Sequence, residues 1–420
     1  MPTFPRMAQG IQINEELLAG SSYFDSDERR AALCELFRFA HRRVLLGVGA
    51  TAKVATECER LEARRVLLVR DPEIEGVVAP VVEALRAGGI DIVSTFTDIV
   101  PNPTIASVDA LSAVLRDADC DAVIAVGGGS TMDSAKVGCA VATCGGSAAE
   151  YFGFDQFPTP SKWPLLCLPT TAGTGAEVSR VSVIVAEGGK QAIYSDHIQP
   201  RGAIVDPGLS AGMPPGLTAT TGLDALGHAL ECTASTKSDA LGDAVARESL
   251  AAGMPHFIRA IENGGDLEAR YQMSRCSLLA GLLLSPINTG AAHALGYGIE
   301  KLSFEKGRPV PHGTAVALVL PGVMAHNTPA VADKYYFAAG VAGLDLAGQS
   351  REAGAHLAAG WIDATRRRHT PYGTLADAGL TAADLPRMID IALQVRRLLD
   401  PNPVPVEAED AERIYRAVLS

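Results

Sequence analysis

Asp224 and His228 lie four residues apart in the run Thr221–Glu231, whose alanines and leucines favour a helix. A helix places residues four apart on one face, one above the other. A carboxylate and an imidazole in that arrangement can bind one divalent cation from one side. The same spacing suits a hydrogen-bonded pair or a buried structural histidine, and for this segment alone that alternative is favoured. The run also predicts that the helix begins here, with Thr220 or Thr221 as its cap.

A glycine-rich turn follows the apolar stretch at 121–126 and precedes a segment with helical character. It consists of Gly127, Gly128, Gly129 and Ser130. Glycines let the backbone approach a pyrophosphate closely, and the N–H groups of a helix start point toward it. We expect Ser130 to cap the helix, with Asp133 forming part of a capping box. The turn lacks the G-x-G-x-x-G pattern, so an ordinary glycine turn is an equal alternative for this stretch alone.

A second loop, at 168–177, gathers three hydroxyl groups and two glycines behind a short apolar stretch. The hydroxyl groups belong to Thr170, Thr171 and Thr174. Such a loop can hold a ribose or a base through hydroxyl and backbone hydrogen bonds. A capped loop that binds no ligand explains the same residues equally well.

Composition limits the kinds of protein that this chain can be. Its 420 residues are too many for one ordinary core, and 47% hydrophobic with 20% charged residues indicates a well-buried soluble protein. A net charge of −12 argues against nucleic acid or an anionic membrane as a partner. We expect no signal peptide and no run able to span a bilayer. Eight cysteines without a Cys-x-x-Cys pair indicate reduced thiols in a cytoplasmic protein.

The elements that must position these residues change in character along the chain. Apolar stretches at 43–50, ending in a glycine turn, and at 65–71, 90–93 and 121–126 alternate with segments of helical pattern at 52–62, 76–87 and 105–117. This alternation predicts a parallel sheet covered on both faces. Beyond residue 207 the pattern is almost entirely helical. We therefore expect an α/β domain at 1–207 and a helical domain at 208–420. An amphipathic segment is also expected at 28–43.

These separated motifs, taken in order, resemble the iron-containing (group III) alcohol dehydrogenase family almost from end to end. The segments that carry the resemblance are Gly127–Ser130 with Asp133 and Lys136, Pro169–Gly175, Asp206–Pro207, Gly222–Glu231, Pro311–Gly313, and Asn402–Pro405 with Asp410, Ile414 and Tyr415. Several motifs in the family's order make a chance match hard to credit. The resemblance implies the architecture of dehydroquinate synthase, with a Rossmann-like α/β nucleotide-binding domain, an all-helical domain, and a metal in the cleft between them.

The resemblance implies four protein ligands to one divalent ion, Fe²⁺ or Zn²⁺. Carried over by position, the ligands are Asp224, His228, His293 and His312. His293 is placed by register, because the small-residue run that starts at Ala280 ends in a ligand histidine in the family. One carboxylate and three neutral imidazoles suit either ion and leave space for a substrate.

The resemblance also implies a nicotinamide dinucleotide. Asp71 ends the apolar stretch 65–71, where the family places an acid beside the adenosine ribose. A carboxylate accepts from a 2′-hydroxyl and repels a 2′-phosphate, so NAD(H) is favoured over NADP(H). The neighbouring Arg70 weakens this preference. The family further implies a homodimer or a larger homo-oligomer.

Tyr297 departs from the family pattern, which often has a second histidine four residues after His293. A phenol there either donates a hydrogen bond to the substrate or only fills space, and the two roles carry equal weight. Tyrosine at this position is similar to family branches that reduce anionic semialdehydes, such as phosphonoacetaldehyde or succinic semialdehyde. Lys301, Lys306 and Arg308 could face such an anion, although charge clusters commonly form a solvated loop.

The activity that the resemblance implies is metal-dependent, NAD(P)-linked hydride transfer between nicotinamide and a small aldehyde or alcohol. We expect His293 and Tyr297 at the reaction centre. The alternatives are a metal-free reductase of the maleylacetate reductase type, a dehydroquinate synthase-like lyase, and a catalytically idle relative. His326 could line the cleft, but a buried structural role is favoured for it.

Overall fold

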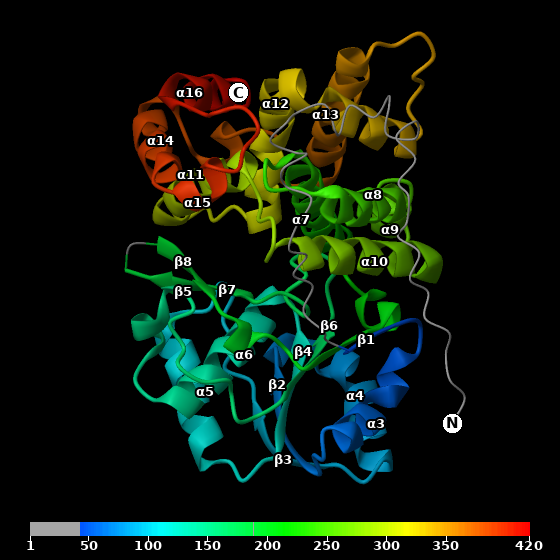
Figure 1. The fold of residues 1–420 in the computed structure, drawn as a ribbon, viewed down its shortest axis with the longest axis vertical. Helices are drawn as coiled ribbons and strands as arrows, with labels where there is room; N and C mark the ends of the chain where they lie inside the picture. Colours follow the sequence, from blue (N-terminus) through cyan, green and yellow to red (C-terminus); the bar gives the residue numbers. More distant parts are fainter. Residues whose placement is uncertain (1–42, 188) are drawn as a thin grey trace, which may run out of the picture. The chain divides into compact units, whose positions relative to one another are not determined.

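The computed structural model describes residues 43–187 and 189–420 (Figure 1). The amphipathic segment expected at 28–43 lies outside these residues except for Arg43. Within the described residues, a sheet with helices on both faces is followed along the chain by a group of helices (Figure 1). The predicted α/β part and helical part are both confirmed.

Six strands form one parallel sheet in the order β1-β9-β6-β4-β2-β3. Their bounds are β1 Arg43–Leu46, β2 Arg65–Arg70, β3 Asp91–Phe96, β4 Ala122–Gly127, β6 Leu165–Pro169 and β9 Gly202–Val205. Every residue of β4 and of β6 is buried, as expected of central strands covered on both faces.

Two pairs of helices cover the sheet. The helices α3 (Val54–Arg60) and α4 (Glu75–Ala87) pack on one face, and α5 (Ile105–Asp117) and α6 (Gly129–Cys144) pack on the other. Successive strand residues point to opposite faces, so Leu68 of β2 packs with the first pair of helices. Its neighbour Leu67 packs with the second pair.

A second, smaller sheet was not predicted from the sequence. The strands β7 (Val181–Ala186) and β8 (Gly189–Tyr194) form an antiparallel hairpin, and the short β5 (Gly153–Phe154) pairs with β8. The strand β8 ends in Ala192, Ile193 and Tyr194, which are all buried. In Figure 1 this hairpin lies below α11 and α15, at the border with the helical part.

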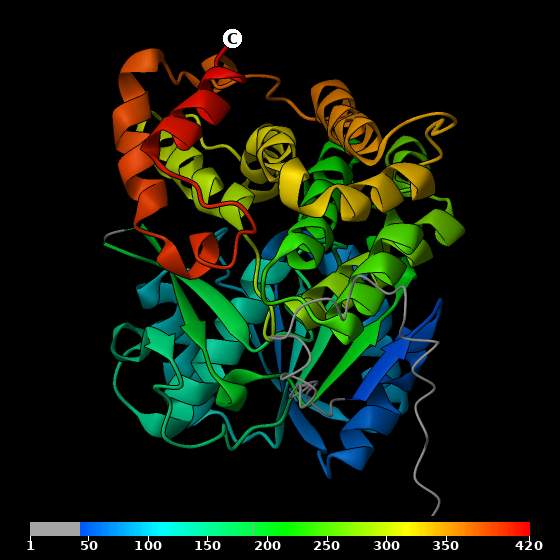
Figure 2. The same ribbon diagram turned by 45° about the horizontal axis from the view of Figure 1, so that its top comes forward.

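The helical part begins at α7 and contains ten α-helices among the described residues (Figure 2). Their bounds are α7 Pro215–Ala234, α8 Ala240–Gly253, α9 Phe257–Glu262, α10 Leu267–Leu283, α11 Ala291–Glu305, α12 His312–Val341, α13 Arg351–His369, α14 Leu385–Leu393, α15 Arg396–Leu399 and α16 Ala408–Arg416. Short 3₁₀ turns lie at Ala50–Lys53, Pro72–Ile74, Ala148–Tyr151, Asp196–Ile198, Pro207–Ser210, Ala376–Ala378 and Ala382–Asp384.

The start predicted for the helix that carries Asp224 was wrong. The helix α7 begins at Pro215, whose ring suits a first helical turn, so Thr220 and Thr221 lie inside the helix and cap nothing. Thr221 donates its hydroxyl to the carbonyl of Leu217, one turn earlier. Asp224 therefore lies in the well-ordered middle of a buried helix and not near a fraying end.

The expectation that no run could span a bilayer was also wrong. Among the described residues, α12 is long and apolar enough to do so by length and composition alone. However, 56% of its most apolar window is buried inside the protein, where α12 packs against α7, α11 and α13. This helix is apolar all round because it crosses the centre of the helical core.

Candidate functional site

A cleft of ≈ 490 Å³ lies between the carboxyl ends of the parallel strands and the helical part. The strands β2 and β4 are neighbours, and the chain crosses from β2 to β3 on one side and from β4 to β6 on the other, so the crossovers run in opposite directions. Open α/β sheets bind ligands beside such a switch point. The loops after β2 and β4 both line this cleft, and they contain Asp71 and Gly128.

The turn after β4 leaves backbone groups free for a ligand. The helix α6 begins at Gly129, with Gly128 before it in extended conformation and no side-chain cap. A Cβ on Gly129 would lie 2.8 Å from the Thr174 side chain, and one on Gly127 would lie 2.2 Å from Thr131 Oγ1. Only glycine fits at these two positions. Gly128, Gly129 and Ser130 line the cleft at a helix start, where backbone N–H groups can bind an anion.

The predicted capping box at this helix was wrong. The Ser130 hydroxyl accepts from the backbone N–H of Asn102 at 3.2 Å and does not cap α6. Asp133 accepts from the N–H of Val183 at 2.9 Å, so it ties α6 to the β7 strand. Buried Lys136 donates to backbone carbonyls, including that of Ala176 at 2.9 Å. These two charged side chains thus hold the second loop and the hairpin against α6.

The second loop lies against the first. Thr170, Thr171 and Thr174 all line the cleft, and the N–H of Thr170 donates to the carbonyl of Gly127 at 2.9 Å. Gly175 has a φ of +62°, and a Cβ there would lie 2.4 Å from the Cα of Gly281 in α10. The loop therefore packs backbone to backbone against the helical part, which fixes the width of the cleft at this point.

Asp71 lies at the end of β2 and lines the same cleft. Its carboxylate accepts from the N–H of Glu73 at 2.9 Å and so caps a short 3₁₀ turn. Arg70 donates to the carbonyls of Asp71 and Pro72 and does not pair with the carboxylate. The second oxygen of Asp71 accepts no hydrogen bond from the described residues.

Three buried side chains bring potential metal ligands together. The ligand atoms of Asp224, His228 and His293 lie within 4.8 Å of one another. Asp224 Oδ1 is 3.7 Å from His228 Nε2, 3.6 Å from His293 Nε2 and 3.7 Å from Nε2 of the less buried His312. The structure thus brings all four predicted ligands around one carboxylate oxygen, from α7, α11 and the first residue of α12.

The arrangement fits a divalent ion. Asp224 Oδ1 and His293 Nε2 are buried and have no hydrogen-bond partner among the described residues. Leaving such atoms unpaired costs about 1–3 kcal/mol each, which a bound ion would remove. A tetrahedral ion with bonds of about 2.0–2.2 Å requires ligand atoms about 3.3–3.6 Å apart, close to the three separations around Asp224.

Two glutamates that the sequence did not single out stand behind the imidazoles. Glu231 contacts His293 Nδ1 and also accepts from the N–H of Ala292 at 2.6 Å. Glu300 lies 2.6 Å from His312 Nδ1 and pairs with Lys190. Such carboxylates fix the ring orientation of a ligating histidine and direct Nε2 toward the ion. The signal available in the sequence was spacing, since Glu231 is seven residues from Asp224 and shares its helix face.

Burial and charge set the protonation of this cluster. Burial opposes ionisation of Asp224, but the three imidazoles outweigh it and hold the pKa of that carboxyl well below its usual range. Burial lowers the pKa of His228 to about 4, so its imidazole is neutral, as metal binding requires. Burial also opposes a charge on His293, but Glu231 and Asp224 outweigh it and raise its pKa to about 10. Glu231 thus makes His293 a stronger base.

Tyr297 lies one helical turn after His293, and its ring stacks beside that of His312 with 6.0 Å between the centroids. Arg397 of α15 donates to its hydroxyl at 3.3 Å. Tyr297, Arg397 and Lys190 all line the cleft. Sequence reasoning missed Lys190 and Arg397 because the hairpin that carries Lys190 and the short α15 were not predicted.

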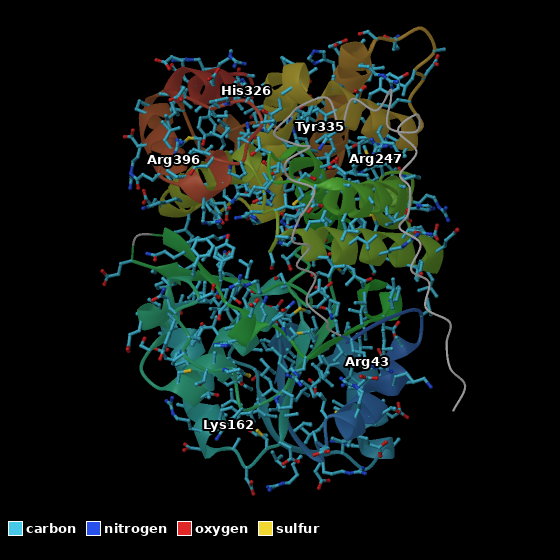
Figure 3. The ribbon with its side chains drawn as sticks, in the orientation of Figure 1. Arg43, Lys162, Arg247, His326, Tyr335 and Arg396 are labelled. Atoms are coloured by element: carbon cyan, nitrogen blue, oxygen red, sulfur yellow. The ribbon has the colours of Figure 1, made fainter. Side chains whose placement is uncertain are left out.

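The three basic residues that could have faced an anionic substrate do not line the cleft. Lys301 is absent from its walls, and Lys306 pairs with Asp384 at 2.6 Å. Arg308 packs beside Gly379. His326 also lies outside the cleft, and its ring contacts the carbonyl of Pro405 at 2.9 Å. Figure 3 shows His326 high in the helical part, away from the sheet.

Comparison with known proteins identifies the family. The chain matches the model of iron-containing alcohol dehydrogenase over residues 41–207 and that of the Fe-containing alcohol dehydrogenase family, C-terminal, over residues 218–419. Choline dehydrogenase of Bacillus subtilis (strain 168) is 35% identical over 387 residues, covering 88% of this chain and 92% of that protein.

Solved structures agree with this match. The structure of 1,3-propanediol oxidoreductase has a TM-score of 0.85 and 31% identity, covering 92% of this chain and 100% of that one. The structure of sulfoacetaldehyde reductase from Bifidobacterium kashiwanohense in complex with NAD⁺ has a TM-score of 0.80 and 27% identity, covering 92% and 99%. The protein is an NAD-linked oxidoreductase that acts on CH–OH groups of small alcohols or on the corresponding aldehydes, and it belongs to the iron-containing alcohol dehydrogenase family.

Proposed function

We propose that this chain interconverts a small aldehyde and its alcohol with Asp224, His228, His293 and His312 holding a divalent ion, Fe²⁺ or Zn²⁺. The observation that carries the proposal is the set of three imidazole Nε2 atoms 3.6–3.7 Å from Asp224 Oδ1. The same cleft contains the uncapped start of α6, which suits a pyrophosphate. The proposed ion site and the proposed dinucleotide site therefore line the same cleft.

When bound, the ion supplies Lewis acidity toward a carbonyl oxygen, and the nicotinamide supplies or accepts the hydride. The chain's own residues position these groups. The α6 start and the threonine loop hold the dinucleotide from the sheet side, while α7 and α11 present Asp224 and His293 from the opposite side. Fixing both reactants on two rigid supports removes much of the entropic cost of hydride transfer.

Tyr297 is the candidate for handling the proton at the reacting oxygen. Its hydroxyl accepts from Arg397 at 3.3 Å, which leaves the phenolic hydrogen free to donate into the cleft. Tyr297 lies four residues after His293 on α11, so the two side chains share a helix face. Tyr297 is therefore on the same side of the cleft as the ligand cluster. We propose that Tyr297 donates a hydrogen bond to the substrate.

We propose NAD(H) as the preferred dinucleotide. The second oxygen of Asp71 is available to accept from a ribose 2′-hydroxyl, and its charge disfavours a 2′-phosphate. The pyrophosphate turn consists of Gly127, Gly128, Gly129 and Ser130. Asp133 supports it from α6. Thr170, Thr171 and Thr174 offer hydroxyls to the rest of the nucleotide.

The relatives leave the charge of the substrate open. One is named a choline dehydrogenase, whose substrate is a cation, and another a sulfoacetaldehyde reductase, whose substrate is an anion. The choice between a cationic and an anionic substrate therefore depends on the charged residues that line the cleft of this chain.

We further propose two domains, 1–207 and 208–420, in a cytoplasmic homodimer or larger homo-oligomer. The strand β9 ends at Val205 and α7 begins at Pro215, which supports the boundary. The seven cysteines of the described residues are all free thiols, which supports a reducing compartment.

Replacement of a ligand tests the metal site. We expect His293→Ala to lose most bound iron or zinc and to lower kcat/KM at least about 100-fold, because losing a ligand removes more than losing its supporting partner. The matched control is His326→Ala, since that histidine lies outside the cleft. Near-normal metal content and rate in the His293 variant would refute the ligand assignment. Unchanged wild-type activity after chelation would instead favour a metal-free reductase.

A further inference from the structure

Arg397 brings a positive charge into the cleft from α15. Its Nη1 donates to the Tyr194 hydroxyl at 2.8 Å and its Nη2 to the Tyr297 hydroxyl at 3.3 Å. Its guanidinium carbon lies 5.7 Å and 5.9 Å from the two ring centroids. Because Tyr194 belongs to the hairpin and Tyr297 to α11, the guanidinium is held from both sides of the cleft.

This charge has no counter-ion among the described residues. No carboxylate in residues 43–187 and 189–420 lies within ion-pairing distance of Arg397, whereas the nearby Lys190 pairs with Glu300. Two hydroxyls use two of the five N–H groups of the guanidinium, and the others have no acceptor among those residues. A half-buried cation without an anion is costly, so this position favours a ligand that supplies negative charge.

The position of Arg397 relative to the ligand cluster limits the size of that ligand. Tyr297 contacts both groups, because its hydroxyl accepts from the guanidinium and its ring lies 6.0 Å from the ring of His312. A molecule with its carbonyl at the cluster and its charge a few bonds away can reach both. We infer that Arg397 forms an anion subsite and that the substrate is a short aldehyde or alcohol carrying a carboxylate, sulfonate or phosphonate.

The same geometry argues against a cationic substrate. The rings of Tyr194 and Tyr297, which both line the cleft, could receive a quaternary ammonium through cation–π contacts. Here the guanidinium already occupies the space near both rings. A quaternary ammonium alcohol such as choline would be repelled by it. The inference rests on the proposed function and adds to it the sign of the substrate's charge.

The test compares two substrates that differ in charge. With NADH, we expect kcat/KM to be at least about 10-fold higher for succinic semialdehyde than for its uncharged methyl ester. Arg397→Ala should lower kcat/KM for the acid at least about 10-fold more than for the ester, mainly through KM, and any loss common to both substrates reports the lost hydrogen bond to Tyr297. Arg397→Lys should recover part of the loss. Sulfoacetaldehyde in place of the acid distinguishes a sulfonate subsite from a carboxylate subsite.

The matched control is Arg396→Ala. Arg396, labelled in Figure 3, precedes Arg397 on α15, is exposed and pairs with Asp400 at 2.7 Å. We expect this variant to act on both substrates like the wild type. Equal rates on acid and ester, equal losses on both in Arg397→Ala, or a preference for choline would overturn the inference.

A binding measurement separates failure of this inference from failure of the proposed function. Absence of nicotinamide turnover with every aldehyde, including the ester, would refute the proposed function alone. Calorimetric titration with succinate needs no turnover. We expect the wild type to bind succinate about 10-fold more tightly than Arg397→Ala, and equal affinities would overturn the anion subsite.

Discussion

Replacing Glu231 by glutamine tests whether the metal site depends on the side chains behind its ligands. The carboxylate is buried, contacts His293 Nδ1 with one oxygen and accepts from the N–H of Ala292 with the other, at 2.6 Å. Both neighbours can donate to a carboxylate. With an ion bound, the carboxylate holds the single ring hydrogen on Nδ1, which leaves the lone pair of Nε2 for the ion.

A glutamine amide cannot satisfy both contacts in the same way. If its oxygen accepts from Ala292, its NH₂ group faces Nδ1 and forces the hydrogen of His293 onto Nε2, the atom that would bind the ion. If the amide flips, NH₂ faces the N–H of Ala292 and one donor is left unpaired, at a cost of about 1–3 kcal/mol. Both outcomes weaken the site, and loss of a supporting partner typically costs 10- to 100-fold in metal affinity.

The assay is the dissociation constant of Zn²⁺ or Fe²⁺, measured by equilibrium dialysis with elemental analysis. We expect Glu231→Gln to raise this constant about 10- to 100-fold. The control is Glu248→Gln, because Glu248 is on the exposed face of α8 and pairs with Arg275. A dissociation constant within about 2-fold of wild type in Glu231→Gln would refute the argument that this carboxylate sets the tautomer.

Two other predictions concern the sheet side of the cleft. A Cβ in Gly129→Ala would lie 2.8 Å from Thr174, so we expect NADH affinity, measured by fluorescence titration, to fall about 10-fold with metal content unchanged. Unchanged affinity would contradict the proposed pyrophosphate turn. Burial raises the pKa of Glu177 from 4.5 to about 7, so the folded state binds its proton more tightly than the unfolded state. The contribution of this group to stability is full below pH about 4.5 and is lost between about pH 4.5 and 7, by roughly 3 kcal/mol in total. Glu177→Gln should therefore raise the melting temperature more at pH 8 than at pH 5, and an equal change at both would contradict the pKa shift.

The sequence predicted the order of strands and helices in the α/β part, because this order depends mainly on which residues are buried. The all-apolar β4 and the alternation of strands and helices up to β9 followed from residue type. The hairpin β7–β8 did not, because Lys190 and Gln191 interrupt its apolar alternation and its inner end is buried by contacts from other elements. The start of α7 was misplaced because threonines suit a cap in isolation, whereas Pro215 begins the helix earlier.

The residues of the candidate site also differ in how far the sequence could predict them. Asp224 and His228 share one helix face by spacing, whereas His293 and His312 came from the family resemblance, and the structure brings all four together. Arg397 could not be predicted, because its place depends on how α15 folds back over the hairpin and α11.

The most direct test of the metal site is a crystal structure of freshly purified protein with anomalous data collected at the iron and zinc edges. The account predicts one anomalous peak in the cleft, about 2.0–2.2 Å from Asp224 Oδ1 and from the Nε2 atoms of His228, His293 and His312. An active enzyme whose anomalous peak lies elsewhere, or that has no peak at these four side chains, would contradict it.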